Sequence, residues 1–135
     1  MNRPTSFFVY GTLKRGQIRE TLWPCVPLQI RHATVRAVLH DLGPYPGITI
    51  GEDTVAGELW TFCEADIDRT IEVLDEIEWY QQDGNDLYVR QIVPCACEDA
   101  AAIDAFAYFY ANTAELTSDN RIVANSMGIS SWPQS

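Results

Sequence analysis

The chain has 135 residues, of which 47% are hydrophobic and 21% are charged, so it has the size and composition of one globular domain with its own core. It carries 9 Lys and Arg against 19 Asp and Glu, a net charge of −10, which argues against nucleic acid as a partner because a phosphate backbone attracts basic surfaces. No apolar run could span a bilayer, and the four apolar residues after Met1–Ser6 are too few for a signal peptide, so we expect a cytoplasmic protein with no membrane partner.

The first predicted element is a buried strand over Phe7–Tyr10 that stops at a glycine. Gly11 permits a tight turn, Thr12 adds a hydroxyl and Leu13 an apolar side chain. A strand that delivers consecutive backbone N–H groups to a tight loop can hold an anion or an oxyanion. The same pattern is also typical of a purely structural turn, and the residues alone leave both interpretations open.

The middle of the chain favours strands. We predict a short helix over Gln17–Trp23 that ends at a proline, then a strand over Arg31–Leu39. A turn is predicted at Gly51–Asp53 and a further strand over Thr54–Phe62.

Between these two strands, Asp41–Ile48 contains two prolines and two glycines, which predict a defined turn. Tyr45 is held between the prolines and either lines a pocket or covers the core. In the strand that follows, alternation puts Glu58 on the face of Trp60 and Phe62. This glutamate therefore lies at an exposed strand end or is paired inside the protein.

The clearest predicted helix covers Asp66–Glu78. On a helical wheel with Ile67 at zero, Glu78 falls at roughly 20°, within the apolar stripe. A carboxylate placed there is costly unless it is paired or protonated, and burial raises its pKa. Either Glu78 is aimed at the core for a functional reason, or the helix ends early and Glu78 only caps it.

The remaining elements are a loop over Gln81–Asp86, strands over Leu87–Pro94 and Ala105–Tyr110, and a hairpin-like connection at Glu98 and Asp99. The tail from Asn112 to Ser135 is weakly patterned and is expected to be irregular, with Trp132 as a cover. The order of elements predicts an α+β fold in which strands dominate and one main helix packs on a curled sheet. We expect a single domain over 1–135, with its core at about 6–111.

The cysteines predict no metal site. Cys95 and Cys97 are separated by one residue, which is not the spacing of a structural zinc site, and the histidines are distant in sequence. We expect Cys25, Cys63, Cys95 and Cys97 to be reduced and mostly buried thiols.

Five short motifs together resemble the gamma-glutamylcyclotransferase-like superfamily, above all its small bacterial and plant-type members and the gamma-glutamylamine cyclotransferases. They occur in the order typical of that superfamily and span Phe7 to Tyr110. The motifs are Tyr10-Gly11-Thr12-Leu13, Tyr45-Pro46-Gly47, Val55-x-Gly57-Glu58-Leu59, Leu74-Asp75-x-x-Glu78 and Tyr88-x-Arg90.

The resemblance implies a small mixed β-barrel with one main helix and short flanking helices. It implies an enzyme that closes a gamma-glutamyl amide into 5-oxoproline without metal or cofactor, with Glu78 as general acid and base. Residues Tyr10–Leu13 would cradle the glutamyl group, with Tyr45 beside it, while Glu58 and Arg90 would brace the framework. The implied partner is a small gamma-glutamyl compound, and no residue pattern indicates an oligomeric state.

The chain departs from the superfamily at two places. Trp79 follows Glu78 where a glycine is frequent, and Gly128–Trp132 replaces a Gly-Asp-Trp-like end. A bulky Trp79 bears on the shape of the pocket and so on the substrate. Two alternatives stay open, namely another ring-closing or amide-cleaving enzyme on the same scaffold, and a small-molecule-binding module without catalysis.

Overall fold

A computed structural model describes residues 3–80, 86–97 and 101–132. Its strands are β1 (Ser6–Val9), β2 (Gln29–Asp41), β3 (Pro46–Thr61), β4 (Tyr88–Cys97), β5 (Ile103–Tyr110) and β6 (Ile129–Ser130). Its helix is α1 (Ile67–Ile77), and short 3-10 turns lie at η1 (Glu20–Leu22), η2 (Glu64–Asp66) and η3 (Thr113–Glu115). None of the helices within these described ranges is long and apolar enough to cross a membrane.

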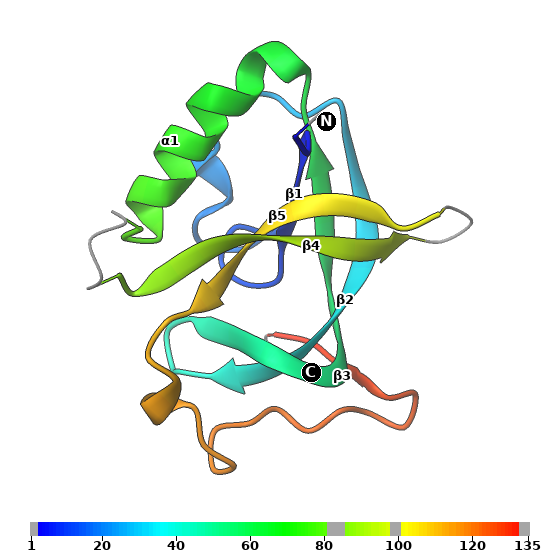
Figure 1. Ribbon diagram of the computed structural model, residues 1–135, viewed down its shortest axis with the longest axis vertical. Helices are drawn as coiled ribbons and strands as arrows, with labels where there is room; N and C mark the ends of the chain where they lie inside the picture. Colours follow the sequence, from blue (N-terminus) through cyan, green and yellow to red (C-terminus); the bar gives the residue numbers. More distant parts are fainter. Residues whose placement is uncertain (1–2, 81–85, 98–100, 133–135) are drawn as a thin grey trace.

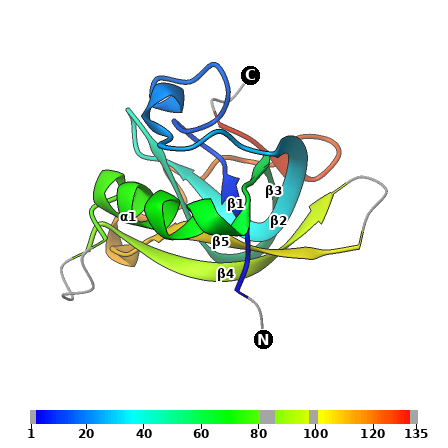
Figure 2. The same cartoon turned by 90° about the horizontal axis from the view of Figure 1, so that it is seen from above.

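The strands close into a small mixed barrel. Hydrogen-bonded neighbours run in the order β1-β5-β4-β2-β3-β6, and β1 also pairs with β3, which closes a ring of five strands. The pairing of β1 with β5 is parallel, while the pairings of β1 with β3, β2 with β3, β2 with β4 and β4 with β5 are antiparallel. Helix α1 runs along one side of this barrel (Figures 1 and 2). The predicted α+β barrel with one main helix is confirmed.

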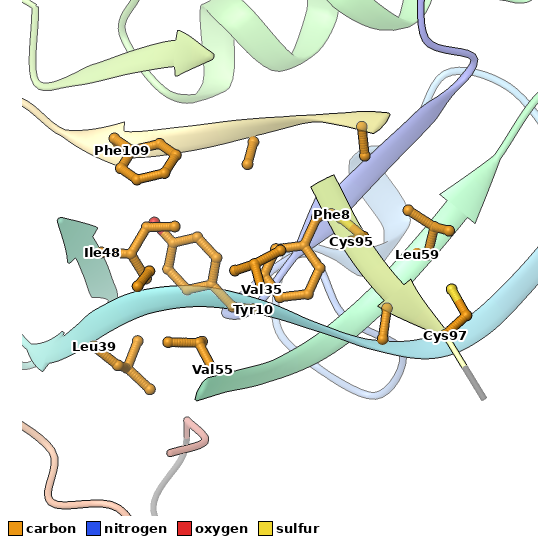
Figure 3. Close-up of a cluster of buried hydrophobic side chains, with 14 of the residues drawn as sticks. Phe8, Tyr10, Val35, Leu39, Ile48, Val55, Leu59, Cys95, Cys97 and Phe109 are labelled. Atoms are coloured by element: carbon orange, nitrogen blue, oxygen red, sulfur yellow. The ribbon is translucent and has the colours of Figure 1, made fainter. Parts of the chain in front are cut away.

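Strand β1 divides the core in two because successive side chains point to opposite faces of a strand. Phe8 and Tyr10 point into the barrel, where Figure 3 shows them gathered with residues of the other strands. Phe7 and Val9 point outward into a second cluster against α1, with Ile67 and Leu74. The apolar stripe predicted for the helix is the face that packs here.

The predicted turn at Gly51–Asp53 is wrong, since these residues lie inside β3. The register between β2 and β3 jumps from Arg36 opposite Thr54 to Val38 opposite Thr49. Several residues of β3 therefore face one residue of β2, as in a β-bulge. The turn-forming sequence marks this bulge rather than the end of a strand.

Other boundaries differ by a few residues. The predicted helix over Gln17–Trp23 is only the 3-10 turn η1, and β4 extends past its predicted end to Cys97. The loop predicted over Gln81–Asp86 falls mostly at 81–85, outside the described residues. The hairpin-like connection predicted at Glu98 and Asp99 falls at 98–100, also outside them. The four cysteines are free thiols, two of them buried and two partly buried.

The tail is more ordered than expected. Its strand β6 pairs in parallel with β3, and the backbone of Arg121 forms an isolated antiparallel β-bridge with His40. Ile122 is buried in the barrel core, and Trp132 packs against this core. Trp132 thus covers the barrel, as predicted, although much of the tail before it is also docked.

Candidate active site

A pocket opens where the end of β1, the turn before β3 and the end of α1 meet. All of the predicted site residues line it: Tyr10, Gly11, Thr12, Leu13, Tyr45 and Glu78. Its volume, traced by the centre of a water molecule, is about 40 Å³, which is room for a few waters or one compact polar group. The sequence left open whether Tyr45 lines a pocket or covers the core, and in the structure it lines this pocket.

The loop after β1 leaves backbone donors for a ligand. The N–H groups of Gly11, Thr12 and Leu13 have no hydrogen-bond acceptor among the described residues. Three adjacent N–H groups on a tight turn are suited to bind a carboxylate or an oxyanion. The carbonyls of the same residues are occupied by Lys14 N–H at 3.1 Å, Arg19 N–H at 2.8 Å and Trp23 Nε1–H at 3.0 Å.

Gly11 is required by a close approach. A Cβ atom at this position would lie 2.7 Å from Cγ of Pro46, a distance that real Cβ contacts do not reach. The proline that opens β3 therefore packs directly on the loop, and only glycine allows this contact. The loop and the Tyr45–Pro46 turn thus form adjoining walls of the pocket.

Glu58 fixes the far end of the loop. It is buried on β3, and its carboxylate accepts hydrogen bonds from the Arg15 backbone N–H at 2.9 Å and from Arg15 Nε at 3.1 Å. Trp60 Nε1 donates to the same carboxylate at 3.1 Å. Glu58 is therefore paired inside the protein and holds the loop to the barrel.

Buried tyrosines form the floor of the pocket. Tyr10 Oη donates to the Tyr108 carbonyl at 2.6 Å, and Tyr88 Oη donates to the Pro46 carbonyl at 2.5 Å. Burial, and then the nearby Glu78 charge, raise the pKa of Tyr10 well above its usual value. Burial likewise raises the pKa of Tyr88 and of Tyr108. These side chains are neutral hydroxyls that offer oxygen lone pairs to the pocket.

Glu78 brings a carboxyl group to this neutral, aromatic pocket. Helix α1 ends at Ile77, and Glu78 is its C-cap, with its backbone N–H donating to the Leu74 carbonyl at 2.9 Å. Its side chain faces the tyrosines. Burial raises the pKa of Glu78 from 4.5 to about 7, although the charge of Arg19 opposes this shift. A carboxyl group with this pKa exchanges a proton readily near neutral pH.

Asp75, one turn before Glu78, anchors the helix end to the barrel. Its Oδ1 accepts from Tyr108 Oη at 2.6 Å, and its Oδ2 pairs with Arg90 of β4. Tyr108 in turn receives the Tyr10 hydrogen bond on its carbonyl. A continuous set of contacts therefore links Arg90 to the residue at the start of the loop and fixes the distance between the loop and Glu78.

Three further residues line the pocket that were not predicted from the sequence as site residues, namely Arg19, Tyr88 and Tyr108. The two tyrosines gave a weak indication of a polar site, because a tyrosine on a buried face of a strand brings a hydroxyl group that needs a hydrogen-bond partner, which a phenylalanine does not. Arg19 gave none, because it precedes an irregular turn.

Trp79 directly follows Glu78 with φ of 58°, in the left-handed region that favours glycine. Its side chain is 68% exposed and so leaves the pocket rather than filling it. Within the described ranges, no group of three or more His, Cys, Asp or Glu side chains is placed to hold a metal ion.

Comparisons with known proteins identify relatives and a family. Among curated proteins, a relative is the gamma-L-glutamyl-butirosin B gamma-glutamyl cyclotransferase of Niallia circulans, which is 29% identical over 96 residues, covering 70% of this chain and 59% of the relative. This chain therefore spans less than two thirds of that relative's length.

Among solved structures, an AIG2-like protein from Mus musculus superposes with a TM-score of 0.65 at 20% identity and covers 98% of both chains. YkqA from Bacillus subtilis superposes with a TM-score of 0.59 at 23% identity, covering 80% of this chain and 36% of YkqA. At these identities the two structures show a shared fold. A family model described as "Gamma-glutamyl cyclotransferase, AIG2-like" matches residues 7–128, and the chain therefore belongs to this family.

Proposed function

We propose that the protein is a gamma-glutamyl cyclotransferase that converts a gamma-glutamyl amide to 5-oxoproline and a free amine or amino acid. The observation that carries this proposal is Glu78, a carboxyl group whose pKa burial raises to about 7, which lines one small pocket together with the Gly11–Leu13 loop. The N–H groups of that loop have no acceptor in the described part of the chain. A proton-transfer group and an anion-binding loop are the two parts that such a ring closure needs.

In the proposed reaction, the Glu78 carboxylate first takes a proton from the α-ammonium group of the substrate. The freed nitrogen attacks the γ-carbonyl carbon and forms the new C–N bond of the ring. Glu78 then gives this proton to the nitrogen of the leaving group as the original C–N bond breaks. The released amine takes the second proton of the ring nitrogen, so the products are the neutral lactam ring of 5-oxoproline and an ammonium group. No water is consumed and no proton is gained or lost overall.

The walls of the pocket support the folded substrate conformation that this attack requires. Tyr10, Tyr45 and Pro46 line a small pocket together with Glu78, and we propose that these walls favour a glutamyl chain whose amine is folded towards its γ-carbonyl. Holding two reacting groups in this way lowers the barrier of an intramolecular step by many-fold. The N–H groups of Gly11, Thr12 and Leu13 would bind the glutamyl carboxylate or the developing oxyanion.

The test is release of 5-oxoproline from a panel of glutathione, a gamma-glutamyl amino acid and gamma-glutamyl-ε-lysine. The wild type should release 5-oxoproline from at least one member, and Glu78→Gln should lower kcat/KM by about 10²- to 10⁴-fold. Glu72→Gln, on the exposed face of the same helix, is the matched control and should retain activity. Full activity of Glu78→Gln, or binding of panel members with no turnover by the wild type, would contradict the proposal.

A further inference from the structure

A second depression adjoins the pocket and shares one residue with it. This outer groove is lined by Arg19, Leu22, Val73, Glu76, Ile77 and Trp79. It is a more open depression than the inner pocket, with a volume of about 370 Å³. Arg19 lines both spaces, and the groove is also lined by Ile77 and Trp79, the residues on either side of Glu78 in the chain. The outer groove is therefore a space into which the rest of a bound substrate could extend.

Arg19 brings an available positive charge to the junction of the two spaces. The ion pairs of the described residues involve Arg3, Arg15, Arg69, Arg90 and Arg121. Arg19 has no carboxylate partner at ion-pair distance within residues 3–80, 86–97 and 101–132, although it is only partly exposed and interacts with Glu78 at longer range. A half-buried guanidinium that forms no ion pair is a ready site for a substrate carboxylate.

The chemistry of the leaving group decides which carboxylate fits. The leaving nitrogen must lie beside Glu78 to receive its proton. In an α-amino acid, the carboxylate is only two bonds from that nitrogen, which brings it to the side of Glu78 where Arg19 lies. An amine whose carboxylate is several carbons away, or absent, would leave Arg19 without this contact.

We propose that Arg19 binds the α-carboxylate of an α-amino acid leaving group, and that the side chain of this amino acid lies in the outer groove against Trp79. The inference rests on the proposed function and adds the residue that selects the leaving group, together with a preference for leaving groups that have an apolar or aromatic side chain. The apolar lining, Leu22, Val73, Ile77 and the exposed indole of Trp79, suits such a side chain.

The test compares two substrates that differ only in the carboxylate, gamma-glutamyl-phenylalanine and gamma-glutamyl-phenethylamine. The wild type should favour the phenylalanine compound by about 10- to 100-fold in kcat/KM, as expected for a hydrogen bond to a charged group. Arg19→Gln should reduce this preference to near one while still turning over the phenethylamine compound, and Arg19→Lys should restore part of it.

Two features make this comparison specific. Loss of the Arg19 charge also affects Glu78, but equally for both substrates, so the ratio isolates the carboxylate contact. Arg36→Gln removes the same charge from an exposed position of β2 and should leave the ratio unchanged.

Trp79→Ala tests the placement of the side chain in the outer groove. It should lower the preference for gamma-glutamyl-phenylalanine over gamma-glutamyl-alanine several-fold.

The outcomes separate this inference from the proposed function. Turnover of both substrates by the wild type with no preference for the carboxylate, or a preference that survives in Arg19→Gln, would overturn the inference alone. No turnover of either substrate, together with none from the wider panel, would overturn the proposed function and the inference with it.

Discussion

Glu78 combines two roles that the sequence presented as alternatives. It caps the C-terminus of α1 through its backbone, and its side chain also continues the apolar stripe of the helix into the pocket. Helical periodicity predicted this direction, because a residue just past the last turn still follows the angular spacing of the helix. The tyrosines that desolvate it are Tyr10, directly after β1, and residues of β4 and β5, and no local pattern could show that these distant residues meet there.

The desolvated carboxylate makes Glu78 costly to the fold above neutral pH. Its folded pKa of about 7 exceeds the usual 4.5, so the folded state binds more protons than the unfolded state between these values, and stability falls as pH rises through this window. One pKa unit corresponds to about 1.4 kcal/mol. Glu78→Gln, which is neutral at every pH, should therefore be more stable than the wild type by about 3 kcal/mol at pH 8.

Urea unfolding at pH 4 and pH 8 checks this prediction. At pH 4 the carboxyl group is protonated in both folded and unfolded states, so the two proteins should have nearly equal unfolding free energies. A variant that is less stable than the wild type at pH 8 would show that the Glu78 carboxylate is stabilised by its surroundings rather than desolvated.

At the scale of elements, the pocket depends on how β3 holds the loop after β1. The sequence placed Glu58 on an aromatic face and left its partner open, since Arg15 lies 43 residues away in the chain. The prediction of a turn at Gly51–Asp53 is wrong for a similar reason, because the conformation there depends on the pairing of β3 with β2. Local residue types indicate that a backbone bends, but strand pairing decides whether the bend ends a strand or forms a bulge within it.

Removing the Glu58 carboxylate should destabilise the protein. Glu58→Ala would leave the Trp60 indole N–H buried without an acceptor and release the Arg15 end of the loop, which we expect to lower the free energy of unfolding by about 1–3 kcal/mol. The matched control is Glu72→Ala, whose carboxylate pairs with Arg69 on the exposed face of α1. It should change stability by less than about 0.5 kcal/mol. Equal costs for the two variants would contradict a bracing role for Glu58.

At the scale of the whole molecule, the order of elements predicted a curled sheet with one main helix, and the family motifs predicted a mixed barrel, but neither predicted which strands close the barrel or that its tail docks. Closure depends on the pairing of β1 with both β3 and β5, which joins opposite ends of the chain. The tail has little periodicity because its contacts are made residue by residue, through Ile122, Ser130 and Trp132, rather than by one continuous face.

The docked tail should contribute measurably to stability. Ile122 is 3% exposed in the barrel core, whereas its neighbour Val123 is 76% exposed. Ile122→Ala would leave a cavity and should cost about 2–4 kcal/mol. Val123→Ala should cost less than about 0.5 kcal/mol. Denaturant unfolding of both variants measures the difference, and a small cost at Ile122 would mean that the tail covers the barrel only loosely.

The most direct test of the central claim is the pH dependence of kcat/KM for 5-oxoproline release between pH 5 and pH 9. A general base must be ionised in the free enzyme, so activity should rise tenfold per pH unit at low pH and level off above an apparent pKa of about 7. A rise that is already complete by pH 5, or a rate that falls as pH increases, would contradict Glu78 as the desolvated carboxylate that accepts the substrate's proton.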